Sequence, residues 1–499
     1  MNRHVMVYPD QKELKVLSGT NLLVALRDAG LAPEAPCGGH GTCGKCQVLV
    51  DGEEKLACQV MVDADICVKL PVKEQINILS EGTETAMEIN PIKEGYLAAF
   101  DIGTTTVVCY LLDGVTGKVL AHASVLNPQA PYGADVISRI QAALDGQMDT
   151  QTEIIRRGMS GLISEVCRKA GINPEEISVV SVVANPCMQQ LFMGISPENL
   201  AAVPFDAVLN KIDIVPAADY LPECKNAVLP VIPNISGYVG SDTVGCVIST
   251  DMDHAKDICL MVDIGTNGEM VLSKRGRMTA CSTAAGPALE GAKIHFGMRG
   301  APGAIDHVRA EDGMIRCSVI GDIPAAGICG SGLIDAVAVM LELGIINKRG
   351  RIQTGDKMPE YTNRLQEIDG TRVFYLTEEV YLTQDDIREV QLAKGAIAAG
   401  IELMAEHLEL RIDQIDSVML AGAFGSFMNP DSACRIGLLP AELKTKITAV
   451  GNAAGSGSRI VACDREQLER TQDIVEKVEF IELAALPKFQ KCFAMNTNF

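Results

Sequence analysis

The chain is poor in several features that whole classes of protein require. Its 43 lysines and arginines are outnumbered by 64 aspartates and glutamates, which gives a formal net charge of -21. Such an acidic surface would be repelled by the phosphates of nucleic acids and of anionic membranes, so we expect neither as a partner. No apolar run approaches the ~18–20 residues that a membrane-spanning helix needs. A soluble protein or a small ligand is the better expectation for a partner.

The sequence also lacks an apolar signal segment after its basic start at Met1-Asn2-Arg3. Its 17 cysteines are spread along 499 residues, whereas disulfide frameworks belong mainly to short secreted chains. We therefore predict a cytoplasmic protein with reduced thiols, apart from one cluster. A chain of this length exceeds the ~250–300 residues of a single core, so it should form two or three domains.

The first part of the chain has the pattern of a small α+β domain. Alternation of apolar and polar residues predicts three strands, and the spacing of apolar residues predicts one helix. The strands are expected at His4–Tyr8, Leu14–Leu17 and Gln47–Val50, and the helix at Asn21–Ala29. Short strands with one helix favour a compact β-grasp domain over residues 1–72. The polar, aperiodic stretch 73–94 is typical of a linker.

The rest of the chain, residues 95–499, reads as a longer α/β region with an internal repeat. Three successive strands joined by tight turns form a β-meander pattern, and the pattern returns in the second half. The two sets are Leu97–Phe100, Val107–Leu112 and Val119–Val125, then Ile258–Val262, Glu269–Ser273 and Met278–Ala280. This repeat predicts a duplicated fold of two subdomains.

Four cysteines lie close together in the N-terminal region, in the segment Cys37-Gly-Gly-His-Gly-Thr-Cys43-Gly-Lys-Cys46 and at Cys58. Thiolates on a glycine-rich loop suit an iron–sulfur cluster, because backbone N–H groups can turn toward the sulfurs. The spacing of five, two and eleven intervening residues is close to the plant-type [2Fe–2S] arrangement. A structural zinc site is the alternative, but only Cys43 and Cys46 form a C-x-x-C hook. His40 is expected to pack or to hydrogen-bond, since a Rieske centre needs two histidines. The other 13 cysteines occur singly and should pack as small hydrophobes.

Two similar loops stand at the repeated positions, Asp101-Ile-Gly-Thr-Thr-Thr106 and Asp263-Ile-Gly-Thr-Asn-Gly-Glu269. Each follows an apolar strand and places an acidic residue, a glycine and hydroxyl or amide side chains at a tight turn. Such a turn offers N–H and hydroxyl donors to phosphate, while the aspartate can hold Mg²⁺ directly or through water. Two such loops in one chain predict a nucleotide site.

Three further glycine-rich segments have weaker signals. Leu420-Ala-Gly-Ala-Phe-Gly425 lets the chain approach a flat ligand such as adenosine, although any strand-to-helix turn could look the same. Gly451-Asn-Ala-Ala-Gly-Ser-Gly457 favours either close helix packing or a nucleotide contact. Gly327-Ile-Cys-Gly-Ser-Gly332 precedes an apolar helix at Leu333–Leu343 and resembles an anion-binding helix start, but it lacks the Lys-Ser/Thr of a P-loop.

The order of cysteine cluster, linker and duplicated phosphate loops resembles the reductive activators of corrinoid proteins, within the superfamily of actin, sugar kinases and heat-shock chaperones. The resemblance covers essentially the whole chain. Matching segments include Asn127-Pro-Gln129, Gly133-Ala-Asp-Val-Ile-Ser-Arg139, Ser236-Gly-Tyr-Val-Gly-Ser-Asp242 and Gly286-Pro-Ala-Leu-Glu-Gly291. It implies an N-terminal ferredoxin-like domain followed by a duplicated actin-like ATPase fold.

The resemblance also implies a set of site residues. Asp101 and Asp263 would act at MgATP, with Glu269 or Glu290 as a carboxylate that orients the attacking water. The nucleotide would be surrounded by Gly103, Thr104, Thr105, Thr106, Gly265, Thr266, Asn267, Gly268, Gly422, Ala423, Phe424 and Gly425. Cys37, Cys43, Cys46 and Cys58 would hold a [2Fe–2S] cluster.

The activity implied is ATP-dependent reduction of inactive Co(II) to Co(I) in a corrinoid protein of a methyltransferase or O-demethylase system. The partners would be that corrinoid protein and a low-potential electron donor, and a homodimer would fit the family. Three alternatives stay open: an activator of a radical dehydratase, a small-molecule kinase with an attached redox domain, and an electron carrier with a vestigial ATP site.

Overall fold

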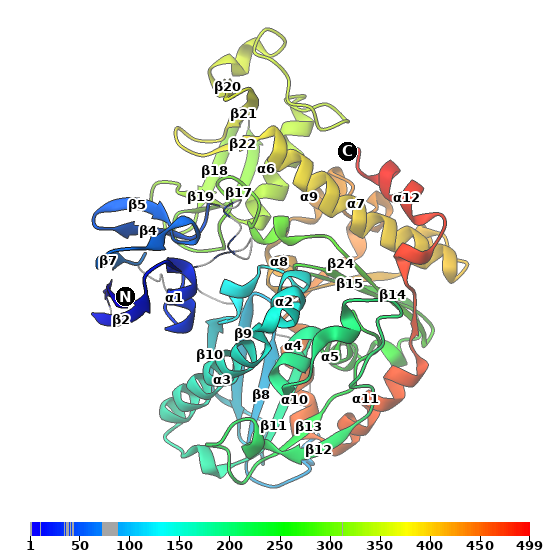
Figure 1. The fold of residues 1–499 in the computed structure, drawn as a ribbon. Helices are drawn as coiled ribbons and strands as arrows, with labels where there is room; N and C mark the ends of the chain where they lie inside the picture. Colours follow the sequence, from blue (N-terminus) through cyan, green and yellow to red (C-terminus); the bar gives the residue numbers. More distant parts are fainter. Residues whose placement is uncertain are drawn as a thin grey trace.

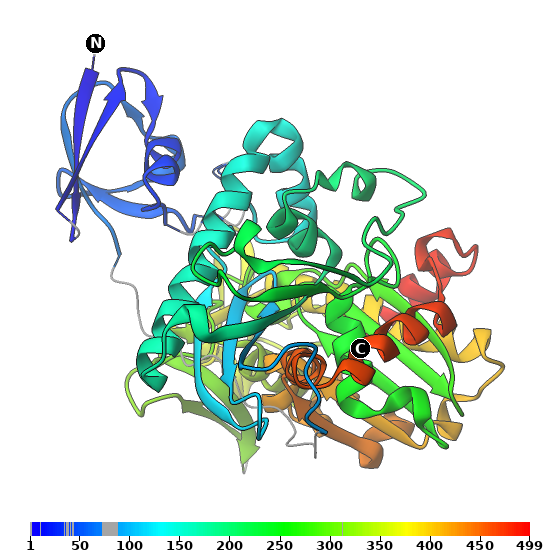
Figure 2. The ribbon, with the colours of Figure 1, turned by 90° about the horizontal axis from the view of Figure 1, so that it is seen from below.

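The computed structural model describes residues 2–9, 11–33, 35, 39, 41, 44–71, 88–311 and 313–499, with the side chain of Ala423 left out. Figure 1 shows a small N-terminal domain beside a large α/β body, and Figure 2 shows that domain as a separate lobe. No helix in these ranges is both long enough and apolar enough to cross a bilayer.

The N-terminal domain is a five-stranded sheet of order β2-β1-β7-β4-β5 with one short helix. Its elements are β1 Asn2–Tyr8, β2 Lys12–Leu17, β3 Thr20–Asn21, α1 Leu22–Asp28, β4 Gln47–Val50, β5 Glu53–Leu56, β6 Met61–Val62 and β7 Ile66–Lys69. Leu22, Leu23 and Leu26 of α1 are fully buried with Val5 and Val7 of β1. The three predicted strands and the helix are confirmed, and Asn21 caps the helix by accepting from two backbone N–H groups.

The first half of the body is a six-stranded sheet of order β10-β9-β8-β11-β13-β12. Its strands are β8 Tyr96–Ile102, β9 Thr106–Leu112, β10 Val119–Leu126, β11 Ile177–Ala184, β12 Asp213–Pro216 and β13 Val228–Val231. Its helices are α2 Val136–Ala142, α3 Met148–Ala170, α4 Pro186–Met193 and α5 Ser241–Thr250. β8, β9 and β10 form the predicted antiparallel meander, and β11 and β13 continue from β8 in parallel.

The second half repeats this order in the sheet β24-β23-β14-β15-β16-β25. Its strands are β14 Ile258–Ile264, β15 Gly268–Lys274, β16 Arg277–Thr283, β23 Ser417–Ala421, β24 Ile447–Gly451 and β25 Glu479–Phe480. Its helices are α6 Gly330–Glu342, α7 Gln384–His407, α8 Gly422–Phe427, α9 Pro430–Arg435, α10 Ala453–Cys463, α11 Arg465–Lys477 and α12 Phe489–Asn496. Strands β14 to β16 form the meander. Two parallel strands again continue from its first strand: β23 pairs with β14, and β24 pairs with β23. The predicted duplication is therefore confirmed at the level of strand order.

Two small sheets extend the second half and were not predicted. Their strands are β17 Ala304–Glu311, β18 Met314–Val319 and β19 Gly327–Ile328 in one sheet, and β20 Leu365–Ile368, β21 Thr371–Tyr375 and β22 Tyr381–Thr383 in the other. They lie near one end of the body in Figure 1.

The two halves meet where helices α5 and α10 cross. A Cβ placed on Gly457 of α10 would lie 2.1 Å from the carbonyl oxygen of Gly245 in α5, so only glycine permits this crossing. Close helix packing thus explains Gly457 in the segment 451–457, and the nucleotide contact of that segment stays a prediction. The crossing places the ends of β8 and β14, which carry the two predicted phosphate loops, on either side of one cleft.

Candidate functional site

Two of the four predicted cluster cysteines lie within the described residues, and their thiols are adjacent. The Sγ atoms of Cys46 and Cys58 are 3.3 Å apart, with Cys46 buried and Cys58 half-buried. The β4–β5 hairpin brings them together, because Gln47 pairs with Leu56 and Ala57 N–H donates to the Cys46 carbonyl at 2.8 Å. Cys37, Cys43 and His40 fall outside the described residues.

This thiol pair fits a metal ligand set. A tetrahedral metal with ~2.3 Å bonds to sulfur separates two ligating sulfurs by about 3.8 Å, which a small rotation of either side chain reaches from 3.3 Å. By contrast, most of the 13 other cysteines are buried, as expected for packing. Burial raises the thiol pKa of Cys187 and of Cys224 to about 12, so both stay protonated.

The two predicted phosphate loops face each other across the cleft and are joined by one carboxylate. Thr105 of the first loop donates its hydroxyl to Glu290 Oε2 at 2.8 Å, and Thr266 of the second loop donates to the same oxygen at 2.9 Å. Glu290 ends a short 3₁₀ turn at Pro287–Glu290, after β16. The fold therefore brings together the two loops and Glu290, as the resemblance implied.

Four carboxyl groups gather at the bottom of the cleft, where they are half-buried. Removal from bulk water raises the pKa of Asp101 and of Asp263 to about 7 from the ordinary 3.8, and repulsion from Asp242 adds to both. Burial raises the pKa of Asp242 to about 6. Burial raises the pKa of Glu269 as well, and repulsion from Asp242 and Asp263 adds to this effect. Crowded oxygen donors of one charge suit a hard divalent cation, so the residues present fit Mg²⁺.

Polar side chains from neighbouring elements hold the first loop by hydrogen bonds. Its turn is closed by Gly103 N–H donating to the Thr106 carbonyl at 2.9 Å. Arg139, almost fully buried on α2, donates to the Thr104 carbonyl at 2.5 Å, and Asn185 donates to the Thr104 hydroxyl at 3.1 Å. These contacts fix the direction in which the loop hydroxyls point.

Sequence reasoning did not assign these supporting residues to the site. Arg139 and Asp242 end two of the segments that carried the resemblance, which was the available signal. Asn452, whose amide donates to Asp101 Oδ2 at 2.9 Å, lies in the glycine-rich segment after β24. Asn185 caps α4 at the end of β11, where Ala184-Asn185 departs from the Gly-Asn more usual in the family that the sequence resembles.

The third predicted element, Gly422–Gly425, forms the start of α8 against the second loop. Gly422 has φ +83°, and a Cβ there would lie 2.7 Å from Asp263 Oδ1, so the close approach requires glycine. The ring of Phe424 lies against Gly330, where a Cβ would meet it at 2.7 Å. Packing thus explains the three glycines of the segment 327–332: Gly330 lies against Phe424 and Leu289, Gly327 against Phe296 and Met298, and Gly332 against Ile305. Gly265 and Asn267 close the second loop with a backbone hydrogen bond of 2.9 Å, and Gly268 starts β15.

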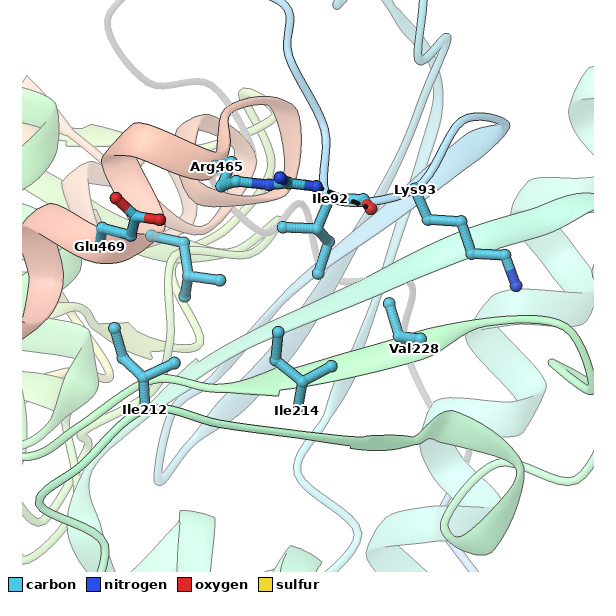
Figure 3. A pocket seen from close by; sticks show the side chains of 8 residues that line it. Ile92, Lys93, Ile212, Ile214, Val228, Arg465 and Glu469 are labelled. Carbon is cyan, nitrogen blue, oxygen red and sulfur yellow. Dashed lines mark hydrogen bonds between the residues drawn. The ribbon is translucent and has the colours of Figure 1, made fainter.

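A small chamber of about 50 Å³ opens between the two halves beside the first loop. It is lined by Thr104, Thr105, Ala130, Ala134, Arg139, Pro287, Glu290, Ala292 and Arg299. A larger cavity, about 340 Å³, lies away from both phosphate loops. Figure 3 shows it between the apolar side chains of Ile92, Ile212 and Ile214, with Arg465 donating to the Ile92 carbonyl at 3.4 Å. That cavity marks the place where the end of the predicted linker, at Ile92 and Lys93, packs on the body, whereas Thr104, Thr105 and Glu290 line the chamber.

Comparisons with known proteins agree with these two centres. Three domain families match: the 2Fe-2S iron-sulfur cluster binding domain over residues 5–63, the RACo middle region over 96–255, and the C-terminal ASKHA domain of RACo over 257–499. The middle region begins at the strand that carries Asp101, so in those terms the first half of the body is the middle region.

Relatives of similar length carry related names. The corrinoid activation enzyme RamQ from Eubacterium limosum is 36% identical over 81% of this chain and 70% of its own. A Co(II) methylated amine-specific corrinoid protein reductase from Methanosarcina barkeri is 25% identical over 77% of this chain and 73% of its own. The solved structure of a reductive activator for corrinoid, iron-sulfur protein superposes with a TM-score of 0.76 at 28% identity, covering 100% of this chain and 98% of its own.

Proposed function

This chain belongs to the reductive activators of corrinoid proteins, and from that premise we propose that it uses ATP to return an inactive Co(II) corrinoid protein to Co(I). The corrinoid protein would serve a methyltransferase or O-demethylase system. A low-potential donor would deliver the electron to the N-terminal domain, residues 1–72. The linker 73–94 would connect it to the ATPase domain, residues 95–499.

The observation that carries the proposal is the presence of both centres in one chain. Cys46 and Cys58 hold their thiols 3.3 Å apart in a 2Fe-2S family domain. The two phosphate loops converge on Glu290 in an ASKHA domain. An electron carrier needs only the first centre and a kinase only the second.

The residues that would hold the cofactors follow from these positions. Cys37, Cys43, Cys46 and Cys58 would ligate one [2Fe–2S] cluster. The acidic residues Asp101 and Asp263 would hold Mg²⁺ directly or through water, the two loops would receive the phosphates, and the segment 422–425 would lie against adenosine. When bound, the cluster would supply transfer of one electron at a time and MgATP the free energy of hydrolysis.

Glu290 is the better placed of the two candidate carboxylates for orienting water. Its Oε2 accepts from Thr105 and Thr266, and a nucleotide phosphate would take the same two hydroxyls. Glu290 would then be free to accept a hydrogen bond from water beside the phosphate. Burial and repulsion from Asp242 raise the pKa of Glu269, which makes Glu269 a poorer acceptor than an ordinary glutamate.

ATP is needed if the donor is less reducing than the cobalt couple. Each ~59 mV of uphill one-electron transfer requires ~1.4 kcal/mol. Shifting a two-state equilibrium from 1:99 to 99:1 takes ~5.5 kcal/mol, which closure of two halves on a nucleotide can supply. The glycine crossing of α5 and α10 is where such a closure would hinge.

The decisive experiment mixes the intact protein, a low-potential donor and a Co(II) corrinoid partner, and records the Co(I) spectrum with and without MgATP. We expect Co(I) only with MgATP. Cys46→Ser should abolish reduction but keep nucleotide binding, whereas Cys67→Ser, an exposed cysteine of the same domain outside the cluster, should have no effect. Equal Co(I) without ATP, from a donor well above the cobalt potential, would refute the proposal.

Metal analysis separates the alternatives for the N-terminal domain. The purified protein should contain about two irons per chain and, when reduced, give the electron-spin signal of a [2Fe–2S] centre. Bound zinc would contradict the cluster assignment, and phosphoryl transfer from ATP to a small acceptor would favour a kinase. We also expect a homodimer, which sedimentation equilibrium measures directly.

A further inference from the structure

Contacts between described residues join the N-terminal domain to the ATPase domain near its predicted cluster loop. Lys45, one residue before Cys46, donates to the Gly297 carbonyl at 3.2 Å. Arg27 at the end of α1 lies over the ring of Tyr132, 5.4 Å from its centroid, and Tyr132 is only 4% exposed. A hydrogen bond from an exposed lysine and a cation–π contact are each weak, so either can break and form again at small cost.

Both contacts are close in the sequence to residues that line the chamber beside the first phosphate loop. Tyr132 is two residues from the lining residues Ala130 and Ala134, and Gly297 is two residues before the lining residue Arg299. The domain therefore docks on segments that also contribute to the chamber, and Glu290 is on the wall of the same chamber.

The chain between Glu290 and Gly297 is packed too tightly to absorb a displacement. A Cβ on Gly297 would lie 2.0 Å from the Gly291 carbonyl oxygen, and a Cβ on Gly291 would lie 2.7 Å from the Met298 carbonyl oxygen. Met298 N–H donates to Ile328, and Ile328 N–H donates back to Phe296, which holds the end of the segment on β19. A displacement of Glu290 must therefore displace Gly297 as well, because tightly packed segments transmit strain.

Phosphate and Glu290 compete for the same donors. The hydroxyls of Thr105 and Thr266 each have one hydrogen to donate, and both donate it to Glu290. A phosphate that takes these hydrogens leaves the Glu290 carboxylate without them and adds repulsion between two anions. Glu290 would then turn from the two hydroxyls toward water beside the phosphate, and the segment that follows it would shift with it.

We propose that the segment 290–297 is a coupling element through which nucleotide binding at the phosphate loops releases the N-terminal domain from its docking surface around Tyr132 and Gly297. The inference rests on the proposed ATP site. By linkage the effect is reciprocal: nucleotide weakens docking, and loss of docking tightens nucleotide binding by the same factor. Release would free the cluster loop to approach the partner protein.

The first test is amide hydrogen exchange of the cluster-loaded protein with and without the non-hydrolysable analogue adenylyl imidodiphosphate plus Mg²⁺. At saturation, exchange should rise in residues 22–31 of the N-terminal domain and in residues 291–300. Glu290→Gln should still bind the analogue but lose the response in residues 22–31. An unchanged exchange rate in residues 22–31 of the wild-type protein overturns the coupling.

The second test is the dissociation constant of the same analogue. Lys45→Ala and Arg27→Ala should each tighten binding about threefold and the double variant about tenfold, since each removes a weak contact that opposes nucleotide. Lys45→Arg, which keeps a donor, should match the wild type, as should Lys15→Ala on β2. Equal affinity for the analogue in all variants would refute the proposed coupling. Failure of the wild-type protein to bind the analogue would instead refute the proposed ATP site.

Discussion

The two phosphate loops have the same backbone origin and different surroundings. Each follows the first strand of a meander and closes with a hydrogen bond from its glycine N–H, Gly103 to Thr106 and Gly265 to Asn267. The first loop rests on neutral and cationic donors, which are Arg139, Asn185 and Asn127. The second loop has more acidic neighbours, because repulsion from Asp242, Asp101 and Glu290 raises the pKa of Asp263, whereas the repulsion that raises the pKa of Asp101 comes from Asp242.

This contrast indicates a division of labour within a duplicated fold. Donors beneath a loop orient its hydroxyls and amides toward phosphate, whereas gathered carboxylates attract a cation. Duplication supplied two equivalent turns. Their neighbours differ because different helices supply them: Arg139 comes from α2 and Asp242 from α5. Three changes test this division.

Asp263→Asn should have the largest effect, a fall in kcat for ATP hydrolysis of about 100-fold, because it removes a proposed Mg²⁺ contact from the acidic loop. The visible spectrum of the cluster should stay unchanged, since Asp263 belongs to a phosphate loop in a separate domain. Steady-state phosphate release and an absorption spectrum check both. Unaltered turnover, or a bleached cluster, would break the proposed separation of the two centres.

Arg139→Met should act on the first loop and give an intermediate effect. It leaves the carbonyls of Thr104 and Gly133 without their donor, so the ATPase domain should lose about 1–3 kcal/mol of unfolding free energy. The KM for ATP should rise about tenfold with a smaller change in kcat, because the loop would no longer be held for phosphate. Denaturant unfolding and steady-state kinetics measure these effects. Arg157→Met, at an exposed ion pair on α3, is the control and should change neither.

The smallest effect is expected from pH and Mg²⁺ on thermal stability. The fold favours protonated Asp101 and Asp263, so their contribution to stability is complete below the ordinary pKa of 3.8 and is lost as pH rises through about 7. Mg²⁺ needs the ionised carboxylates, so it should raise Tm by about 2 °C or more near pH 8 and hardly at all near pH 5.5. Calorimetry checks this. Asp263→Asn should weaken the Mg²⁺ effect at pH 8, and an equal Mg²⁺ effect at both pH values would contradict a cation site on these groups.

Local pattern was sufficient wherever a structure depends on neighbours in the chain. The predicted strands of both meanders lie within β8–β10 and β14–β16, and the helix predicted at Leu333–Leu343 lies at α6, which begins earlier, at Gly330. The two small sheets were missed, and four of their six strands, β19 to β22, have five residues or fewer. The assignment of Cys37, Cys43, Cys46 and Cys58 stays a prediction as a set, although the pair that the structure describes is adjacent.

The sequence by itself determined the two phosphate loops, because each is specified by adjacent residues: an acidic residue, a glycine and hydroxyl side chains after an apolar strand. It also determined the cysteine spacing. Only the tertiary structure decided which distant groups serve those loops. Asp242, Glu290 and Asn452 reach the cleft through the crossing of α5 with α10 and the turn after β16. The resemblance named Glu290, but spacing and periodicity do not place any of the three at the loops, because their role depends on which strands pair and which helices cross, and those contacts join segments far apart in the chain.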